Sequence, residues 1–95
     1  MINGYAVYYG LPGYLPDDGY AVKTLREAYA YALDCKIDAQ DFGFYVSGDI
    51  RRDWRYEIRD FKPNRFLAPR VKATITIEPV TFKSEEQMQA WNESW

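Results

Sequence analysis

The chain contains no histidine and only one cysteine, Cys35, among its 95 residues. Histidine is the commonest general base and a common metal ligand, so its absence excludes Ser-His and Cys-His catalytic arrangements and histidine-based zinc sites. A single cysteine cannot form an internal disulfide, and the position of Cys35 within a predicted helix favours a small half-buried side chain over a nucleophile. We therefore expect a protein that is not an enzyme and that uses no cofactor or metal.

Long apolar runs are also lacking. No run approaches the roughly 20 residues that cross a bilayer, and the first residues show no basic segment followed by an apolar one. We therefore expect no membrane contact and no secretory signal. Apolar side chains are spread along the whole chain, and 95 residues are typical of a single domain with one core, here residues 1–95.

Charge is divided unevenly along the chain. Residues 51–72 contain eight lysines and arginines against three acids, so this part carries +5 and the remainder carries −7. A small domain of this kind can present a basic patch and an acidic surface at once, which affects the choice of partner and the rate of association.

Hydrophobic patterns predict the elements of the first half. Residues 5–11 alternate as in a strand, and residues 12–19, rich in proline, glycine and aspartate, are expected to form a loop. Thr24 and Glu27 form a capping box that begins a helix, which we expect to end near residues 36–37. The apolar face of this helix is expected to consist of Leu25, Ala28, Tyr29, Ala32 and Leu33.

In the second half, alternation predicts a hairpin with strands over residues 42–46 and 51–59, joined by a turn. Residues 70–78 are expected to form the clearest strand, with Val71, Ala73, Ile75 and Ile77 inward, and Pro79 is expected to end its ladder or to mark an edge. A short amphipathic helix begins at Ser84. The inward residues of the hairpin are expected to be Phe42, Phe44, Val46, Trp54, Tyr56 and Ile58.

These elements predict an α+β domain of order β-α-β-β-β-α. We expect an antiparallel sheet of about four strands with both helices on one face. The alternate positions of residues 51–59 and 71–78 are polar, so the opposite face is expected to be open to water and available for function.

The acidic residues do not form a catalytic pattern. Asp53 and Glu57 share one face of a predicted strand, but four residues at about 3.3 Å each separate them by roughly 13 Å, too far for the carboxylates of a glycosidase. The neighbouring arginines predict ion pairs instead. Asp17 and Asp18 lack the further oxygen ligands of a calcium loop and are expected to lie in a solvated turn.

Two short pieces resemble the RNA-recognition motif. VYYGLP, residues 7–12, is similar to the first-strand signature of that family, and FGFYV, residues 42–46, is similar to the core of the third-strand signature, whose aromatics stack on bases. The order of elements differs, because in that family a strand separates the first helix from the signature strand. Gln40 and Asp41 also replace the cationic opening of the signature. We therefore interpret these aromatics as strand packing.

The unbalanced positive charge lies in residues 62–72, where four cations flank Phe66 and Leu67 without any acid. Arginine and aromatic residues are enriched at binding hot spots, whereas the alternative is a solvated connection whose Phe66 folds back onto the core. Residues 12–20 also keep large aromatics in a loop, where such side chains either pack down or make contacts. The predicted partner-binding residues are Arg55, Arg59, Lys62, Arg65, Phe66, Arg70, Lys72, Tyr14 and Tyr20.

In its size, its α+β pattern and its richness in tyrosine and tryptophan, the whole chain resembles the accessory proteins of bacteriophages and mobile elements, among them anti-CRISPR proteins. The resemblance implies a cytoplasmic inhibitor that blocks a host nucleic-acid-processing complex by protein–protein contact. The contact would use either acidic surfaces that imitate DNA or a basic patch that meets an acidic groove. The alternative is a nucleic-acid-binding module with a basic, aromatic surface, whose affinity would fall steeply with salt.

Overall fold

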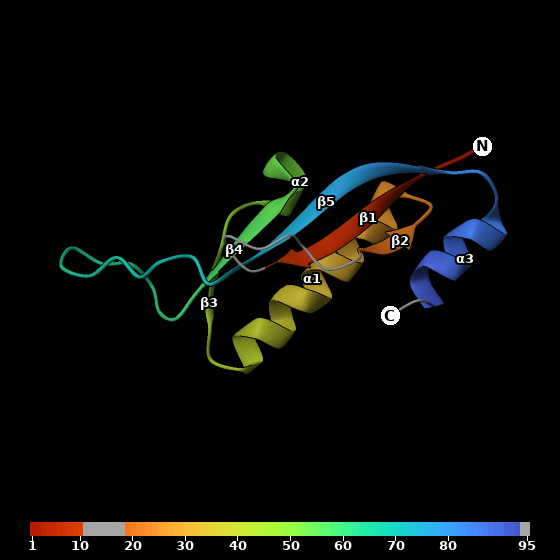
Figure 1. Ribbon diagram of the computed structural model, residues 1–95. Coiled ribbons are helices and arrows are strands. Elements are labelled where there is room, and N and C mark those ends of the chain that lie inside the picture. The colour runs from red at the N-terminus through yellow and green to blue at the C-terminus, as the bar shows by residue number, and fades with distance from the viewer. Residues whose placement is uncertain (11–18, 94–95) are drawn as a thin grey trace.

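The computed structural model describes residues 1–10 and 19–93, which form an α+β domain built on an antiparallel sheet of order β2-β1-β5-β4-β3 (Figure 1). The strands are β1 (Ile2–Gly10), β2 (Tyr20–Val22), β3 (Tyr45–Ser47), β4 (Arg55–Arg59) and β5 (Ala73–Phe82), and the helices are α1 (Leu25–Asp41), α2 (Ile50–Asp53) and α3 (Glu85–Glu93). The predicted α+β class and the antiparallel sheet are confirmed. The expected four strands and two helices are wrong, because the described residues hold five strands and three helices.

The centre of the sheet joins the two ends of the chain. β1 and β5 pair along their whole length, from Ile2 opposite Phe82 to Gly10 opposite Thr74. Pro79 lies within this ladder and does not end it. The backbone N–H of Ile77 donates to the carbonyl of Trp54 at 3.0 Å, so the nitrogen of Pro79, two residues on, also faces away from β1. The pairing of β4 with β5 ends at Arg55 opposite Thr76, so the side of β5 that faces away from β1 is a local edge at Pro79, as one of the two expectations had it, and the proline removes no hydrogen bond to β1.

The core lies between α1 and one face of the sheet. The helix contributes small buried side chains, Ala28, Ala32 and Ala39, which allow its backbone to approach the strands closely. Leu33 was expected on this face, but it is 45% exposed and points elsewhere. The sheet contributes mostly larger residues, which are Val7, Val22, Val46, Tyr56, Ile58, Ala73, Ile75 and Ile77.

Helix α1 continues beyond the expected end near residue 37 because its stop signal is Gly43, which has a positive φ of 91°. The N–H of Gly43 donates to the carbonyl of Gln40 at 2.9 Å, and that of Phe44 donates to the carbonyl of Ala39 at 3.1 Å. These two bonds form a Schellman motif. Phe42 therefore caps the helix and is 83% exposed, so its expected inward position in a strand is wrong.

The expected hairpin is also interrupted, because the one-turn helix α2 lies between β3 and β4. Asp49 caps this helix by accepting from the N–H groups of Arg51 and Arg52, at 3.0 and 3.3 Å. Trp54 ends it in the left-handed conformation, with φ of 53°, and is not part of a strand. Its indole N–H donates to the hydroxyl of Tyr29 at 3.3 Å.

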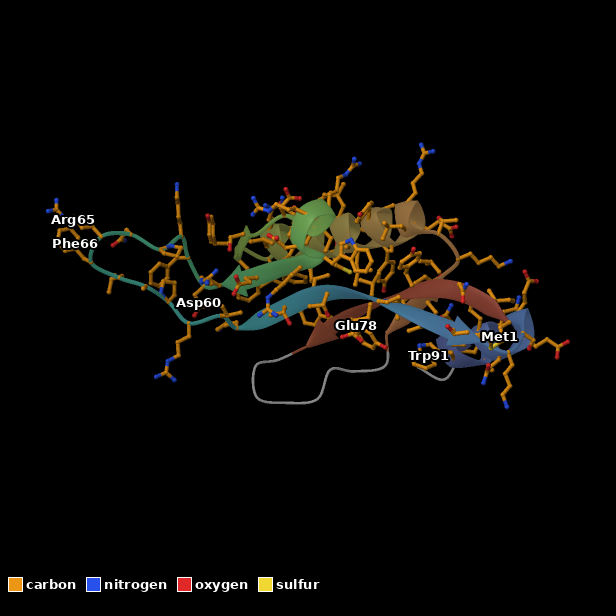
Figure 2. All side chains as sticks on the ribbon, turned by 90° about the horizontal axis from the view of Figure 1, so that it is seen from above. Met1, Asp60, Arg65, Phe66, Glu78 and Trp91 are labelled. Atoms are coloured by element: carbon orange, nitrogen blue, oxygen red, sulfur yellow. The ribbon has the colours of Figure 1, made fainter. Side chains whose placement is uncertain are left out.

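Helix α3 packs at the end of the sheet away from the β4–β5 connection (Figures 1 and 2). Trp91 contacts Phe82 edge to face, with ring centroids 5.4 Å apart. Phe82 lies five residues after Ile77 in β5, so the two side chains point to opposite faces of the sheet and Phe82 lies on the face away from α1. The expectation that both helices cover one face is therefore wrong. Among the described residues, no helix is long and apolar enough to cross a membrane.

Candidate functional site

The connection between β4 and β5 protrudes from the domain as an arm. We call residues 60–72 the basic arm. It extends past the end of the sheet, and Figure 2 shows Asp60 at its base and Arg65 with Phe66 at its tip. The arm contributes to the elongated shape of the molecule, whose principal extents are 51, 24 and 21 Å. Its tip is thus placed where a partner can reach it from several sides.

The base of the arm is closed by Lys72. The ammonium group of Lys72 lies 2.8 Å from the carboxylate of Asp60, and the backbone N–H of Lys72 donates to the carbonyl of Ile58 at 2.7 Å. The same ammonium group lies 5.5 Å from the ring centroid of Phe44. Lys72 was predicted to bind a partner, but its charge is compensated within the fold.

The tip of the arm is organised by Asn64. Its side-chain oxygen accepts hydrogen bonds from the N–H groups of Phe66 and Leu67, at 2.8 and 2.9 Å. Its own N–H donates to the carbonyl of Leu67 at 2.8 Å. These bonds turn the chain so that Phe66 is 86% exposed and Leu67 is 58% exposed. Phe66 therefore does not fold back onto the core.

Three cations of the arm are not compensated. Lys62, Arg65 and Arg70 are exposed, and within residues 1–10 and 19–93 none of them forms an ion pair. The guanidinium group of Arg65 lies 5.9 Å from the ring centroid of Phe66. Residues 61–71 contain no acid, so the tip combines an apolar surface with positive charge.

Arg55 and Arg59 were predicted to belong to the same surface, but they lie on the outer face of β4 with Glu57 between them. The carboxylate of Glu57 is 3.6 Å from the guanidinium of Arg59 and 4.0 Å from that of Arg55. Arg59 also donates to the hydroxyl of Ser47 at 2.9 Å, and its side chain is only 20% exposed. These contacts agree with the ion pairs expected for Glu57. Glu57 therefore offsets one of the two arginine charges of β4, which keeps a net charge of +1.

The two tyrosines of the predicted set do not join the arm. Tyr20 lies in β2, at the opposite edge of the sheet from β3, and stacks on Tyr31 of α1 with ring centroids 4.6 Å apart. Tyr14 lies outside the described residues, as do Asp17 and Asp18. The structure therefore brings together Lys62, Arg65, Phe66 and Arg70, and leaves the other predicted residues at separate places.

Sequence reasoning missed a groove between α1 and α2, with a volume of about 380 Å³. Its residues come from three separate segments, so no local sequence pattern predicts the groove. A partial signal was present, since Arg26, Tyr29 and Leu33 recur at helical spacing on one stripe. The groove is lined by Arg26, Tyr29, Ala30, Leu33, Asp49, Ile50, Arg51 and Tyr56.

Comparison with known proteins adds no relative. No family model matches the chain, and the searches of curated proteins and of solved structures gave no match. Within the part of the chain that the structure describes, no group of three or more histidine, cysteine or acidic side chains could hold a metal ion. Function must therefore be argued from the two surfaces themselves.

Proposed function

We propose that this protein is a non-enzymatic inhibitor that binds another protein through the tip of the basic arm. Phe66 and Leu67 carry this proposal, because they are 86% and 58% exposed although the arm is held in a defined conformation. Burying a side chain of this kind contributes roughly 1.5–3 kcal/mol. Phe66 and Leu67 do not gain this free energy within the fold, and they would gain it on binding to an apolar hollow of a partner.

The positive charge of the arm indicates which charge the partner carries around that hollow. Lys62, Arg65 and Arg70 surround the apolar tip without any acid, so the complementary surface is acidic. Charge complementarity of this kind raises the rate of association and excludes basic partners. We propose as partner the class that the resemblance implies, a host nucleic-acid-processing complex, contacted at an acidic groove on one of its proteins.

Direct binding of nucleic acid is the second candidate, and the exposed Phe66 beside Arg65 favours it, since single strands bind to aromatic side chains next to cations. The protein carries a net charge of −2, and Glu57 offsets one of the two arginine charges of β4. The three uncompensated arm cations and the remaining charge of β4 would then contact phosphates. Such binding would be weak and would disappear at moderate salt. The protein partner is therefore preferred.

Photo-crosslinking from the arm tests the proposal. Benzoylphenylalanine is placed at Phe66 and, as a matched control, at Phe42, which is 83% exposed on another part of the surface. In host lysate we expect one stoichiometric protein crosslink from position 66 and none from position 42. Arg65→Ala with Arg70→Ala should weaken it. Equal labelling from both positions, or no crosslinked protein, would contradict the proposal.

A titration of labelled single- and double-stranded oligonucleotides separates the second candidate from the first. We expect no binding at moderate salt. Saturable binding there, lost on Phe66→Ala, would replace the protein partner with nucleic acid.

A further inference from the structure

The groove between α1 and α2 has the size and the lining of a small-molecule site. Its volume of about 380 Å³ lies within the range of roughly 300–1,000 Å³ that is usual for such sites. One wall is the stripe of α1 that carries Tyr29 and Leu33, and the other wall is the start of α2. The groove is separate from the basic arm, so its function does not depend on the function proposed above.

Tyr56 supplies a polar group from β4. The residue is only 5% exposed, and among the residues that the structure describes none forms a hydrogen bond with its hydroxyl. No side-chain oxygen or nitrogen of the described residues is both enclosed and unpartnered, so this hydroxyl is in contact with solvent, and Tyr56 is one of the residues that line the groove. The hydroxyl of Tyr56 therefore has no hydrogen-bond partner among the described residues and can bond to a ligand.

Two arginines and one acid line the groove beside Tyr56. Arg26 and Arg51 both line the groove, and neither forms an ion pair within residues 1–10 and 19–93. The guanidinium of Arg51 lies 5.6 Å from the ring centroid of Tyr29, and the ammonium of Lys36 lies 5.1 Å from that of Tyr56. The one acid in the lining, Asp49, is occupied in capping α2.

The hydroxyl of Tyr56 is protonated, as a hydrogen-bond donor must be. Burial raises the pKa of its hydroxyl and the charge of Asp49 raises it further, whereas Arg51 acts in the opposite direction. The phenol is therefore protonated at neutral pH and can donate its proton in a hydrogen bond. Arg51, Asp49 and Tyr56 all line the groove.

We propose that the groove binds a small aromatic carboxylate. The carboxylate accepts hydrogen bonds from Tyr56 and Arg51, Arg26 adds positive charge from the opposite wall, and the aromatic ring lies against Leu33. A singly charged carboxylate fits better than a doubly charged phosphate, because Asp49 remains in the lining and repels additional negative charge. The 45% exposure of Leu33, an apolar residue outside the core, is explained by this contact.

Titration of the ¹⁵N-labelled chain by NMR tests the proposal, with benzoate as the probe. We expect saturable shifts of the amides of residues 26–33 and 49–51, and affinity for benzoate about tenfold higher than for neutral benzamide, which has the same shape. Acetate, which lacks the ring, should bind more weakly than benzoate. Phenyl phosphate should also bind more weakly, and tighter binding of the phosphate would overturn the choice of a carboxylate.

Substitutions assign the residues. Tyr56→Phe removes only the hydroxyl and should weaken benzoate about tenfold, while the dispersion of the spectrum shows that the fold is kept. Arg51→Ala should weaken it at least as much. Arg52→Ala is the matched control on α2, because Arg52 lies outside the groove and pairs with Asp53. Equal binding of benzamide and benzoate, unchanged affinity in Tyr56→Phe, or shifts that do not saturate would overturn the proposal.

Discussion

The side chain of Asn92 pairs with the backbone of Ala21 as a neighbouring strand would. Its oxygen accepts from the N–H of Ala21 at 2.8 Å, and its nitrogen donates to the carbonyl of Ala21 at 2.9 Å. β2 is an edge strand of the sheet, and an unpaired edge invites association with other chains. One amide group thus attaches α3 to the sheet and covers this edge.

Asn92→Ala should therefore destabilise the protein by about 1–3 kcal/mol, because two partly buried hydrogen bonds are lost. The free energy of unfolding in urea measures this, and light scattering should show more self-association. Glu93→Ala, at an exposed neighbouring position, is the control. Equal stability of the two variants would show that the contact with Ala21 contributes little.

Gly43 and Gly48 offer a matched pair of substitutions. Both have positive φ, 91° and 105°, so alanine is strained at either position by about 1–2 kcal/mol. A Cβ at Gly43 has no atom within 4 Å, whereas at Gly48 it would lie 2.8 Å from the carbonyl oxygen of Arg55. We expect Gly48→Ala to lower the unfolding free energy clearly more than Gly43→Ala. The reverse order would contradict the backbone geometry given for the β3–β4 connection.

Asn64→Ala should loosen the tip of the arm without changing the stability of the fold much. The substitution removes two exposed hydrogen bonds to Phe66 and Leu67, so global stability should change by less than about 0.5 kcal/mol. The amides of these two residues should exchange with solvent faster. Binding of the partner should weaken, because the tip must then be ordered on binding, which costs conformational entropy. Unchanged amide exchange would show that Asn64 does not hold the tip.

The contact between Lys23 and Glu85 predicts a small dependence of stability on pH. Its hydrogen bond and charge place the pKa of Glu85 below the ordinary value of 4.5. A carboxyl group whose pKa is lower in the folded state stabilises the fold above its unfolded pKa, and this contribution is lost as pH falls through the folded pKa. The difference in urea midpoint between the parent chain and Glu85→Gln should therefore shrink on going from pH 7 to below pH 4. A constant difference would show that the ion pair does not contribute.

Cys35 should react slowly with alkylating reagents. Burial raises the pKa of its thiol, and the nearby charges of Asp38 and Asp34 raise it further. The thiolate is the reactive form, so little of it is present at pH 8. We expect alkylation by iodoacetamide to be several-fold slower in the native protein than in denaturant. Equal rates would contradict this environment and would reopen the interpretation of Cys35 as a reactive residue.

Local chemistry in the sequence predicted where α1 and α3 begin. The hydroxyl of Thr24 accepts from the N–H of Glu27 at 3.1 Å, and Ser84 does the same for Gln87 at 3.3 Å, which is the hydroxyl half of a capping box. Of the inward positions expected for residues 70–78, Ala73, Ile75 and Ile77 are buried in β5, whereas Val71 lies before the strand and is partly exposed. Each of these features depends on residues within a few positions of one another, so the pattern is visible in the chain itself.

The tertiary structure decided the rest, because it depends on contacts between distant residues. β2 has only three residues and forms through its pairing with β1, so no alternation of apolar and polar residues predicted it. Whether Phe66 packed down or faced solvent depended on the turn at Asn64. One of the two arginine charges of β4 was offset by Glu57 on the same face. The groove at Tyr56 required α1, α2 and β4 to meet. The sequence alone determined the class of fold and the location of the excess positive charge, whereas only the packing of distant segments decided which side chains remain available to a partner.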